Sequence, residues 1–236
     1  MNQYDDLNFF NEYAKMTRSQ HGLPGAGEWH QLKKLFPEMQ GKAVLDLGCG
    51  YGWHCKYAIE QGATAVLGID ASERMIKAAC EKNEGTGIAY RVCRLEEYDY
   101  PREAYDLVIS NLVLHYIQDL DAIYRNIFCT LKPGGKFLFN IEHPTFTAGV
   151  HQQFSENGYW PVDNYYYPGE RETEFLGCTV IKQHHTLTQI LMGLIHAGFI
   201  LEVVEEVLPP EEWRADMPEE MRRPMMLLIR AKKPSL

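Results

Sequence analysis

The stretch from residue 44 to residue 53 constrains the fold of this chain more than any other. It reads V-L-D-L-G-C-G-Y-G-W, an apolar run followed by three glycines at alternate positions. The apolar run over 43–47 predicts a short strand buried on both faces, as in parallel sheets. The glycines remove Cβ atoms at a sharp turn, so a ligand can lie directly on the backbone. The stretch therefore predicts a strand, a ligand-binding turn and the start of a helix.

A second predicted strand places a carboxylate beside that turn. Residues 65–69 read A-V-L-G-I and are followed by Asp70. Neighbouring parallel strands end at the same edge of a sheet, where nucleotide-binding α/β folds use such an acid to bind ribose hydroxyls. Dinucleotide-binding folds use G-x-G-x-x-G, but Trp53 stands where the third glycine would be. The spacing therefore speaks against a dinucleotide cofactor.

These landmarks resemble those of class I S-adenosylmethionine-dependent methyltransferases. The pattern D-x-G-x-G-x-G that starts at Asp46 is similar to their first motif, and Asp70 matches their ribose-binding acid. The segments Y-D-L-V-I-S-N at 105–111 and L-K-P-G-G at 131–135 continue the resemblance, which covers about residues 41–142. It implies an α/β fold with a seven-stranded, mostly parallel, doubly wound sheet. It also implies S-adenosyl-L-methionine as the cofactor and methyl transfer as the reaction.

The resemblance further implies where the cofactor binds. Asp46 and the backbone of the glycine turn would hold its methionine portion, with bracing of the turn as the alternative role of this carboxylate. Arg94 stands where the family usually carries an adenine-binding aspartate, so the residues that follow Arg94 would contact the adenine instead. The implied cofactor-binding residues are Asp46, Gly48, Cys49, Gly50, Gly52, Asp70, Ala71, Leu95, Glu96 and Asn111.

His115 is the candidate catalytic residue. It lies four residues past Asn111, just beyond the predicted fourth strand, where a histidine would act as a general base near neutral pH. A histidine that only hydrogen-bonds the backbone is the alternative. Leu112 and Val113 follow Asn111, so the Asn/Asp-Pro-Pro-aromatic signature of enzymes that methylate DNA amino groups or glutamine is missing.

The histidines and cysteines predict no metal centre. His184 and His185 are adjacent, and adjacent residues of a strand point to opposite faces. No cysteine or carboxylate spacing completes a site around them. The six cysteines form no C-x-x-C pair, which indicates free thiols in a reducing compartment.

The composition of the chain limits the classes of partner that we expect it to bind. The chain has 236 residues, of which 45% are apolar, enough for one α/β domain with a full core. Its 23 basic and 32 acidic side chains give a formal net charge of −9, and such a surface repels nucleic-acid phosphates. The sequence shows neither a membrane-spanning run nor an apolar signal segment at its start. We therefore expect a cytoplasmic protein that binds neither nucleic acid nor membranes.

The whole chain, residues 1–236, is predicted to form a single domain. Helices are expected at 8–17 and 28–36, where Tyr13 and Trp29 would close over the methionine end of the cofactor; simple packing is their alternative role. The predicted parts are an N-terminal helical lid at 1–40, a cofactor-binding core at 41–141, an insertion at 142–185 after the fifth strand, and a C-terminal helix with the last two strands at 186–236.

The insertion is the segment expected to meet the methyl acceptor. It is rich in aromatic residues, whereas linkers are polar, and long ordered insertions are usually binding loops or lids. A strand is expected near its end, over 175–183. The alternative for its tyrosines is the surface of a homodimer.

The function predicted on these grounds is methyl transfer to a small-molecule acceptor. A nicotinamide-dependent oxidoreductase shares the strand, turn and ribose acid and is one alternative. A non-catalytic cofactor-binding protein on the same fold is the other, because a fold does not establish an activity. The sequence names neither the acceptor nor the atom that is methylated.

Overall fold

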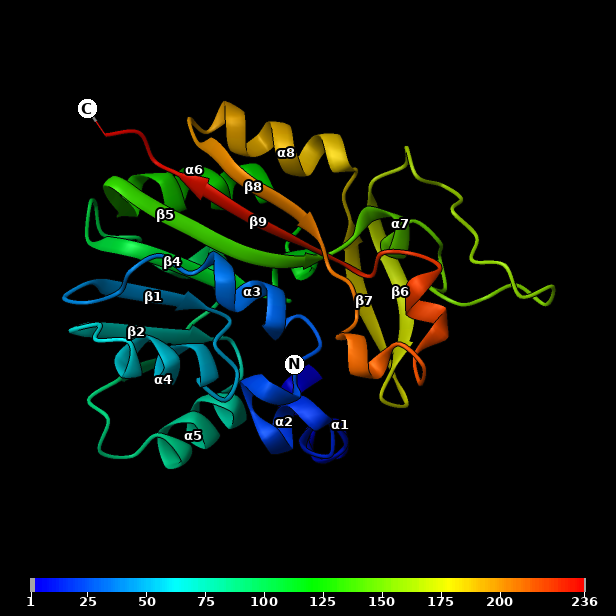
Figure 1. The fold of residues 1–236 in the computed structure, drawn as a ribbon, viewed down its shortest axis with the longest axis horizontal. Coiled ribbons are helices and arrows are strands. Elements are labelled where there is room, and N and C mark those ends of the chain that lie inside the picture. Colours follow the sequence, from blue (N-terminus) through cyan, green and yellow to red (C-terminus); the bar gives the residue numbers. More distant parts are fainter. Residues whose placement is uncertain (1–2, 236) are drawn as a thin grey trace.

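The computed structural model describes residues 3–235 and contains a sheet of seven strands in the order β3-β2-β1-β4-β5-β9-β8 (Figure 1). Strands β1 to β5 run parallel, and β9 is antiparallel to both of its neighbours, β5 and β8. The predicted mostly parallel, seven-stranded sheet is therefore confirmed. Its strands are β1 (Ala43–Leu47), β2 (Ala65–Asp70), β3 (Ala89–Val92), β4 (Tyr105–Asn111), β5 (Leu131–Glu142), β8 (Ile200–Glu206) and β9 (Met226–Lys232).

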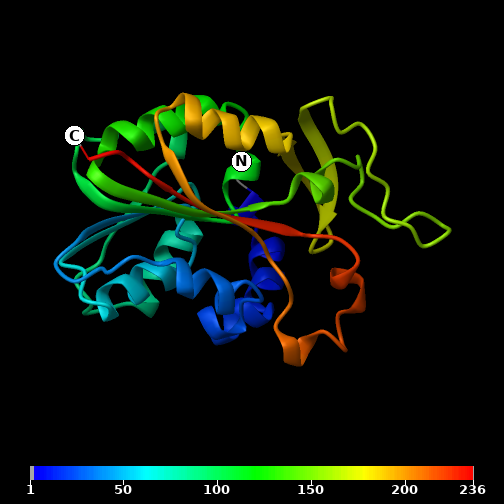
Figure 2. The ribbon, with the colours of Figure 1, turned by 45° about the horizontal axis from the view of Figure 1, so that its top comes forward.

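Helices cover both faces of this sheet, as a doubly wound fold requires (Figure 2). Within β1, Val44 clusters with buried residues of α3, α4 and α5, whereas Leu45 clusters with buried residues of α6 and α8. Both side chains are fully buried, which explains why the strand is a continuous apolar run. The helices are α3 (Trp29–Leu35), α4 (Trp53–Glu60) and α5 (Glu73–Lys82) on one face and α6 (Leu120–Thr130) and α8 (Leu187–His196) on the other.

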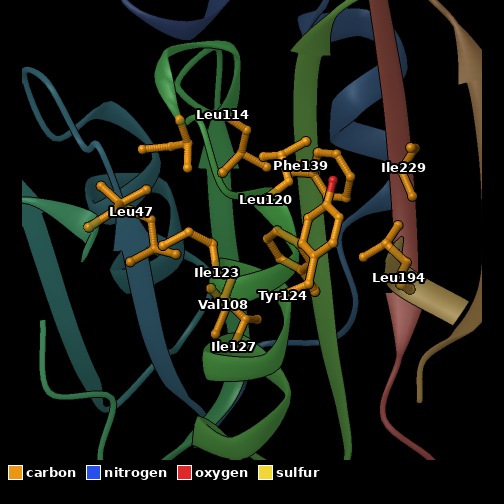
Figure 3. Packing of buried hydrophobic residues seen from close by; sticks show 14 of the residues in the cluster. Leu47, Val108, Leu114, Leu120, Ile123, Tyr124, Ile127, Phe139, Leu194 and Ile229 are labelled. Carbon is orange, nitrogen blue, oxygen red and sulfur yellow. The ribbon is translucent and has the colours of Figure 1, made fainter. Parts of the chain in front are cut away.

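Helix α6 shows how sequence pattern becomes core packing (Figure 3). Asp119 begins the helix, because its side chain accepts a hydrogen bond of 2.9 Å from the backbone N–H of Ala122. Ile123 and Ile127 lie four residues apart and are buried against the sheet together with Tyr124. The apolar face of this helix is thus the face that meets the sheet.

Strand β5 is longer and less regular than its sequence suggests. A tight turn is expected at 133–135, but the strand already begins at Leu131 and absorbs these residues as an irregularity opposite β4. Gly134 adopts a φ of +79°, which glycine tolerates. Its N–H donates to the Lys233 carbonyl at 3.0 Å, so the chain beyond β9 satisfies the backbone of the irregular segment.

The N-terminal segment is more finely divided than expected. The two predicted helices are present as α1 (Leu7–Ala14) and α3, and a further short helix, α2 (Thr17–His21), lies between them. Two 3₁₀ turns, η1 (Gln3–Asp5) and η2 (Leu23–Gly25), flank this pair of short helices. Asp6 begins α1 by accepting hydrogen bonds from the N–H groups of Asn8 and Phe9.

The insertion folds mainly as a separate two-stranded hairpin. Helix α7 (Pro144–Thr147) opens it, and β6 (Gly169–Phe175) pairs antiparallel with β7 (Cys178–His184) beyond the carboxyl edge of the main sheet (Figure 1). The predicted strand at 175–183 corresponds to β7 and the last residue of β6. Leu176 and Gly177 both have positive φ, as a two-residue hairpin turn requires.

Short 3₁₀ turns complete the fold: η3 (Leu95–Glu97), η4 (Leu114–Tyr116), η5 (Glu211–Trp213) and η6 (Pro218–Met221). The last two belong to the loop that joins β8 to β9. No helix within residues 3–235 is long and apolar enough to cross a membrane.

Candidate active site

A cavity of about 1020 Å³ lies at the carboxyl edge of the parallel strands. Four segments that are distant in sequence line it: the N-terminal helices, the glycine turn with the neighbouring strand ends, the hairpin of the insertion, and the loop between β8 and β9. Of the predicted site residues, Tyr13, Gly48, Cys49, Gly50, Asp70, Ala71, Leu95, Glu96, Asn111 and His115 line the cavity.

The three glycines of the turn have different roles. A Cβ on Gly48 would lie 2.3 Å from the Val113 side chain, and one on Gly52 would lie 2.1 Å from the Tyr90 hydroxyl. These two glycines therefore allow close packing of the turn, and Gly52 does not line the cavity. A Cβ on Gly50 would meet nothing within 4 Å, and Gly50 lines the cavity. Gly50 is thus the position where a ligand can approach the backbone.

Asp70 holds this turn from the neighbouring strand. Its Oδ2 accepts a hydrogen bond of 3.0 Å from the Gly50 N–H, and its Oδ1 accepts one of 2.9 Å from the Ser72 N–H. Burial raises the pKa of Asp70, and the two N–H donors oppose that rise. The same helix start binds the N-terminal segment, because Ser72 Oγ donates to Asp5 Oδ1 at 2.7 Å.

Asp46 lies beneath the turn rather than on the cavity wall. Its side chain is 1% exposed, and Cys55 Sγ donates to its Oδ2 at 3.3 Å. Its Oδ1 has no hydrogen-bond partner among the described residues. Burial raises the pKa of Asp46 to about 7. One oxygen of the Asp46 carboxylate thus accepts a hydrogen bond from Cys55, and the other is a buried acceptor with no partner among the described residues.

The predicted adenine end is formed by the first residues of η3. Leu95 is buried, while Arg94 and Glu96 lie exposed at the rim, 3.4 Å apart between Arg94 Nη2 and Glu96 Oε1. Arg94 also approaches Glu97 at 3.8 Å. In this structure Arg94 therefore pairs with the acids that follow it.

A buried network missed by the sequence reasoning joins the N-terminal segment to β4. Arg18 donates two hydrogen bonds, of 3.2 and 3.0 Å, to the carboxylate of Glu28, whose side chain is 1% exposed. Asn111 Nδ2 donates to the same carboxylate at 3.0 Å. Burial alone would raise the pKa of Glu28, but Arg18 and Asn111 outweigh it and lower the pKa. Both partners of the ion pair precede β1, and nothing in their local sequence pattern marks them as a pair.

His115 lines the cavity from η4. It is 3% exposed, its Nε2 lies 3.9 Å from Glu142 Oε1, and its Nδ1 has no hydrogen-bond partner among the described residues. Burial lowers the pKa of His115 to about 4, although Glu142 opposes the shift. His115 is therefore a neutral ring near pH 7.

The two remaining predicted residues, Tyr13 and Trp29, have different positions: one lines the cavity and the other packs away from it. Tyr13 lines the cavity and makes edge contacts with Tyr51. Trp29 lies away from it and packs edge-on against Tyr57 and Phe36. This is the packing role given above as the alternative for Trp29.

His184 and His185 have structural partners. The rings of His184 and His185 donate to the carbonyls of Tyr165 and Ile117 at 2.9 and 2.8 Å, and His184 also binds Thr147. Within the described part of the chain, no group of three or more histidine, cysteine or acidic side chains is placed to hold a metal ion.

Comparison with known proteins identifies the family. The methyltransferase domain family matches residues 45–139. A solved structure from Listeria monocytogenes, named as an S-adenosylmethionine-dependent methyltransferase, is 45% identical and has a TM-score of 0.85 over 91% of this chain and 100% of that one. One from Mesorhizobium loti is 40% identical and has a TM-score of 0.84 over 89% of this chain and 100% of that one. This chain belongs to the S-adenosylmethionine-dependent methyltransferases.

The methyltransferase also has a more distant curated relative. Phosphoethanolamine N-methyltransferase 1 of Arabidopsis thaliana is 36% identical over 50% of this chain but only 24% of its own length. This methyltransferase thus matches about a quarter of that protein. Membership of the family sets aside the oxidoreductase and non-catalytic alternatives and makes S-adenosylmethionine the cofactor.

The residues around the turn of this methyltransferase fit that cofactor. Gly50 leaves open space where a ligand can lie on the backbone, and the Asp70 carboxylate lies beside it. The Oδ1 atom of Asn111, which lines the cavity, is a buried acceptor without a partner among the described residues. Because S-adenosylmethionine carries ammonium and hydroxyl donors, this set of acceptors matches its chemistry.

Proposed function

We propose that this methyltransferase methylates a small, partly apolar or aromatic molecule enclosed in the cavity. The observation that carries the proposal is the volume of the cavity, about 1020 Å³, together with its lining by four chain segments. Sites for small molecules and cofactors range over about 300–1,000 Å³, so this volume suits the cofactor together with one small acceptor.

The walls near His115 support an apolar or aromatic acceptor. Tyr116 of η4, whose ring centroid lies 4.5 Å from that of His115, and Phe146 and Phe175 of the insertion line this part of the cavity. Aromatic rings provide large apolar contacts and also favour a sulfonium cation by about 0.5–2 kcal/mol per well-placed ring.

The charges of the cavity argue against a phosphate-bearing acceptor. The basic residues that line the described cavity are Arg18, Arg94 and Lys182, and each lies within 4.0 Å of a carboxylate. Phosphate groups are usually bound by free arginine or lysine side chains. The acceptor therefore differs from the phosphoethanolamine in the name of the Arabidopsis relative.

In this proposal the chain mainly positions and encloses the reactants. S-adenosylmethionine, when bound, supplies an electrophilic methyl group together with its own leaving group. Gly50, Asp70 and Asn111 hold the cofactor, and the aromatic walls hold the acceptor in line with it and exclude water. His115, neutral near pH 7, accepts the proton that the acceptor's nucleophile loses.

The domain parts take matching roles. Residues 41–141 form the cofactor-binding core, residues 186–235 complete the sheet, and residues 3–40 and 142–185 enclose the reactants from two sides. The N-terminal segment is held in place by the Arg18–Glu28 pair and by the contact of Asp5 with Ser72. Enclosure by these two parts would keep water out of the reaction.

A screen for methyl transfer tests the proposal. Purified enzyme is incubated with methyl-labelled S-adenosylmethionine and a mixture of small metabolites, and the Gly50→Val variant serves as the blank. We expect labelled small-molecule products that form with the wild-type enzyme alone. Label found only in added protein or nucleic acid would contradict the proposal.

A further inference from the structure

The part of the cavity near His115, where the methyl acceptor is proposed to bind, contains a buried ion pair; we call this part the acceptor end. Lys182 Nζ lies 2.5 Å from Glu142 Oε1, and the two side chains are only 6% and 14% exposed. Both residues line the cavity. Gln152 joins them, because it donates to Glu142 Oε2 at 3.4 Å and accepts from Lys182 at 3.3 Å. Two opposite charges are thus fixed side by side in the cavity wall.

The surroundings of this pair are mainly aromatic, and the further charges there are of opposite sign: Glu220 lines the cavity, and the Arg223 guanidinium lies 5.1 Å from the ring centroid of Phe146. Lys182 Nζ lies 5.6 Å from the ring centroid of Phe175 and 6.0 Å from that of Phe146. His115, 3.9 Å from Glu142, is neutral near pH 7 because burial lowers its pKa to about 4. The acceptor end is therefore largely apolar, its positive and negative charges balance, and Glu142 and Lys182 are paired directly.

We propose that the Glu142–Lys182 pair selects the methyl acceptor by charge, admitting molecules whose reacting end is uncharged. The proposal rests on the function proposed above, because it specifies the acceptor of the same cavity. An ammonium or a carboxylate entering there would lose its hydration and find the opposite charge already bound to its partner. A hydroxyl, a thiol or an aromatic amine loses less hydration and can donate a hydrogen bond to Glu142. The acceptor class is therefore a neutral, protic nucleophile on an apolar or aromatic body.

Three probes of one shape test this inference: benzyl alcohol, benzylamine and benzoate, which at pH 7.5 are neutral, cationic and anionic. Their binding to the enzyme loaded with S-adenosylhomocysteine is measured by ligand-observed NMR titration. We expect wild-type enzyme to bind benzyl alcohol best. Lys182→Met leaves an unpaired carboxylate and should strengthen the binding of benzylamine relative to benzyl alcohol by roughly 10- to 100-fold. Glu142→Gln leaves an unpaired ammonium and should strengthen the binding of benzoate relative to benzyl alcohol by a similar factor.

Control variants separate this effect from general changes in charge and folding. Lys136 and Glu202 form a comparable ion pair, at 2.7 Å, between β5 and β8 away from the cavity. Lys136→Met and Glu202→Gln change the net charge equally and should leave the order of the probes unchanged. Because an unpaired buried charge can unfold a variant, Glu142→Gln combined with Lys182→Met provides a neutral alternative that should still prefer benzyl alcohol.

Several results would overturn the inference. If the folded single variants bind the three probes in the same order of affinity as the wild-type enzyme, the pair does not select by charge. The same conclusion follows if the wild-type enzyme binds benzylamine or benzoate more tightly than benzyl alcohol. Wild-type enzyme that binds none of the three probes would contradict charge selection and the small aromatic acceptor together. Because binding is measured without methyl transfer, a charge preference that persists while the metabolite screen yields no product would count against the proposed function alone.

Discussion

At the scale of single residues, Asp70 connects the cofactor site to the fold. Its two oxygens already accept hydrogen bonds from Gly50 and Ser72, so the carboxylate would bind ribose hydroxyls while bracing the glycine turn. Ligand binding and stabilisation of a helix start are compatible roles for this acid, because a carboxylate can accept about four hydrogen bonds.

We predict that Asp70→Ala weakens binding of S-adenosylhomocysteine by roughly 2–4 kcal/mol, the value of two charge-assisted hydrogen bonds. Titration calorimetry measures this loss, and thermal unfolding verifies that the variant is folded. Asp99→Ala is the matched control, because Asp99 is 77% exposed and lies outside the cavity. Equal affinity in both variants would exclude Asp70 from the cofactor site.

Gly50→Val should abolish binding of the same ligand, because a branched side chain would occupy open space on the cavity wall. Part of any effect comes from backbone strain, since Gly50 has a φ of +51°. Gly85→Val controls for this: Gly85 has a φ of +77°, equally open surroundings and no part in the cavity. Calorimetry on the pair should show loss of binding in Gly50→Val only, and loss in both would point to strain.

His115→Gln should retain cofactor affinity and reduce turnover by about 10²–10⁴-fold, the range for one general base. Because burial lowers the pKa of His115 to about 4, the acidic limb of the rate profile should lie near pH 4, rather than near neutrality as its sequence position alone suggested. Rates measured from pH 4 to 9 on an acceptor from the screen test both statements. Unchanged turnover would mean that another group removes the proton or that none is removed.

At the scale of elements, the sequence indicated regular segments better than irregular ones. Strand β1, helix α6 and helix α8 follow from apolar spacing and caps, which are local signals. The irregular start of β5 depends on the carbonyl of Lys233, about a hundred residues away, and could not be found locally. The Arg18–Glu28 pair was missed for the same reason, since only the folded arrangement of α2 and α3 removes both charges from water.

The insertion gives a testable prediction at the scale of elements. Phe146 and Phe175 line the cavity, whereas Tyr159, Tyr166 and Tyr167 are 70%, 85% and 73% exposed. The insertion thus faces both the cavity and the solvent. Limited proteolysis, with and without S-adenosylhomocysteine and at a dilution where the protein is monomeric, should show protection of residues 149–169 by the ligand. Protection that follows protein concentration instead would support the homodimer surface.

At the scale of the whole molecule, buried histidines couple stability to pH. Burial lowers the pKa of both His54 and His115 to about 4, below the value of about 6.5 for an unfolded chain. Between these values the unfolded state binds more protons, so these groups lower the free energy of unfolding as pH falls from about 6.5 to about 4. Asp46, with its pKa raised to about 7, opposes them in this window.

A variant isolates one of these contributions. His54→Gln should reduce the slope of unfolding free energy against pH by about 1.4 kcal/mol per pH unit near pH 5, the value of one proton. Urea titrations between pH 4.5 and 7 measure the slope. His196→Gln, on the exposed side of α8, is the control. Parallel curves for wild type and His54→Gln would show that His54 is not held neutral by the fold.

The position of β9 between β5 and β8 has a consequence for synthesis on the ribosome. Translation delivers β5 and then β8, but the strand that joins them comes last. Until residues 226–232 emerge, the apolar edge of β5, with Phe137 and Phe139, has no neighbour on that side, and β8 has no place in the sheet. An unpaired apolar edge invites pairing with other chains. The nascent chain thus passes through a stage in which this edge is open to other chains, and the cavity, whose wall includes Met226, is incomplete until β9 has emerged.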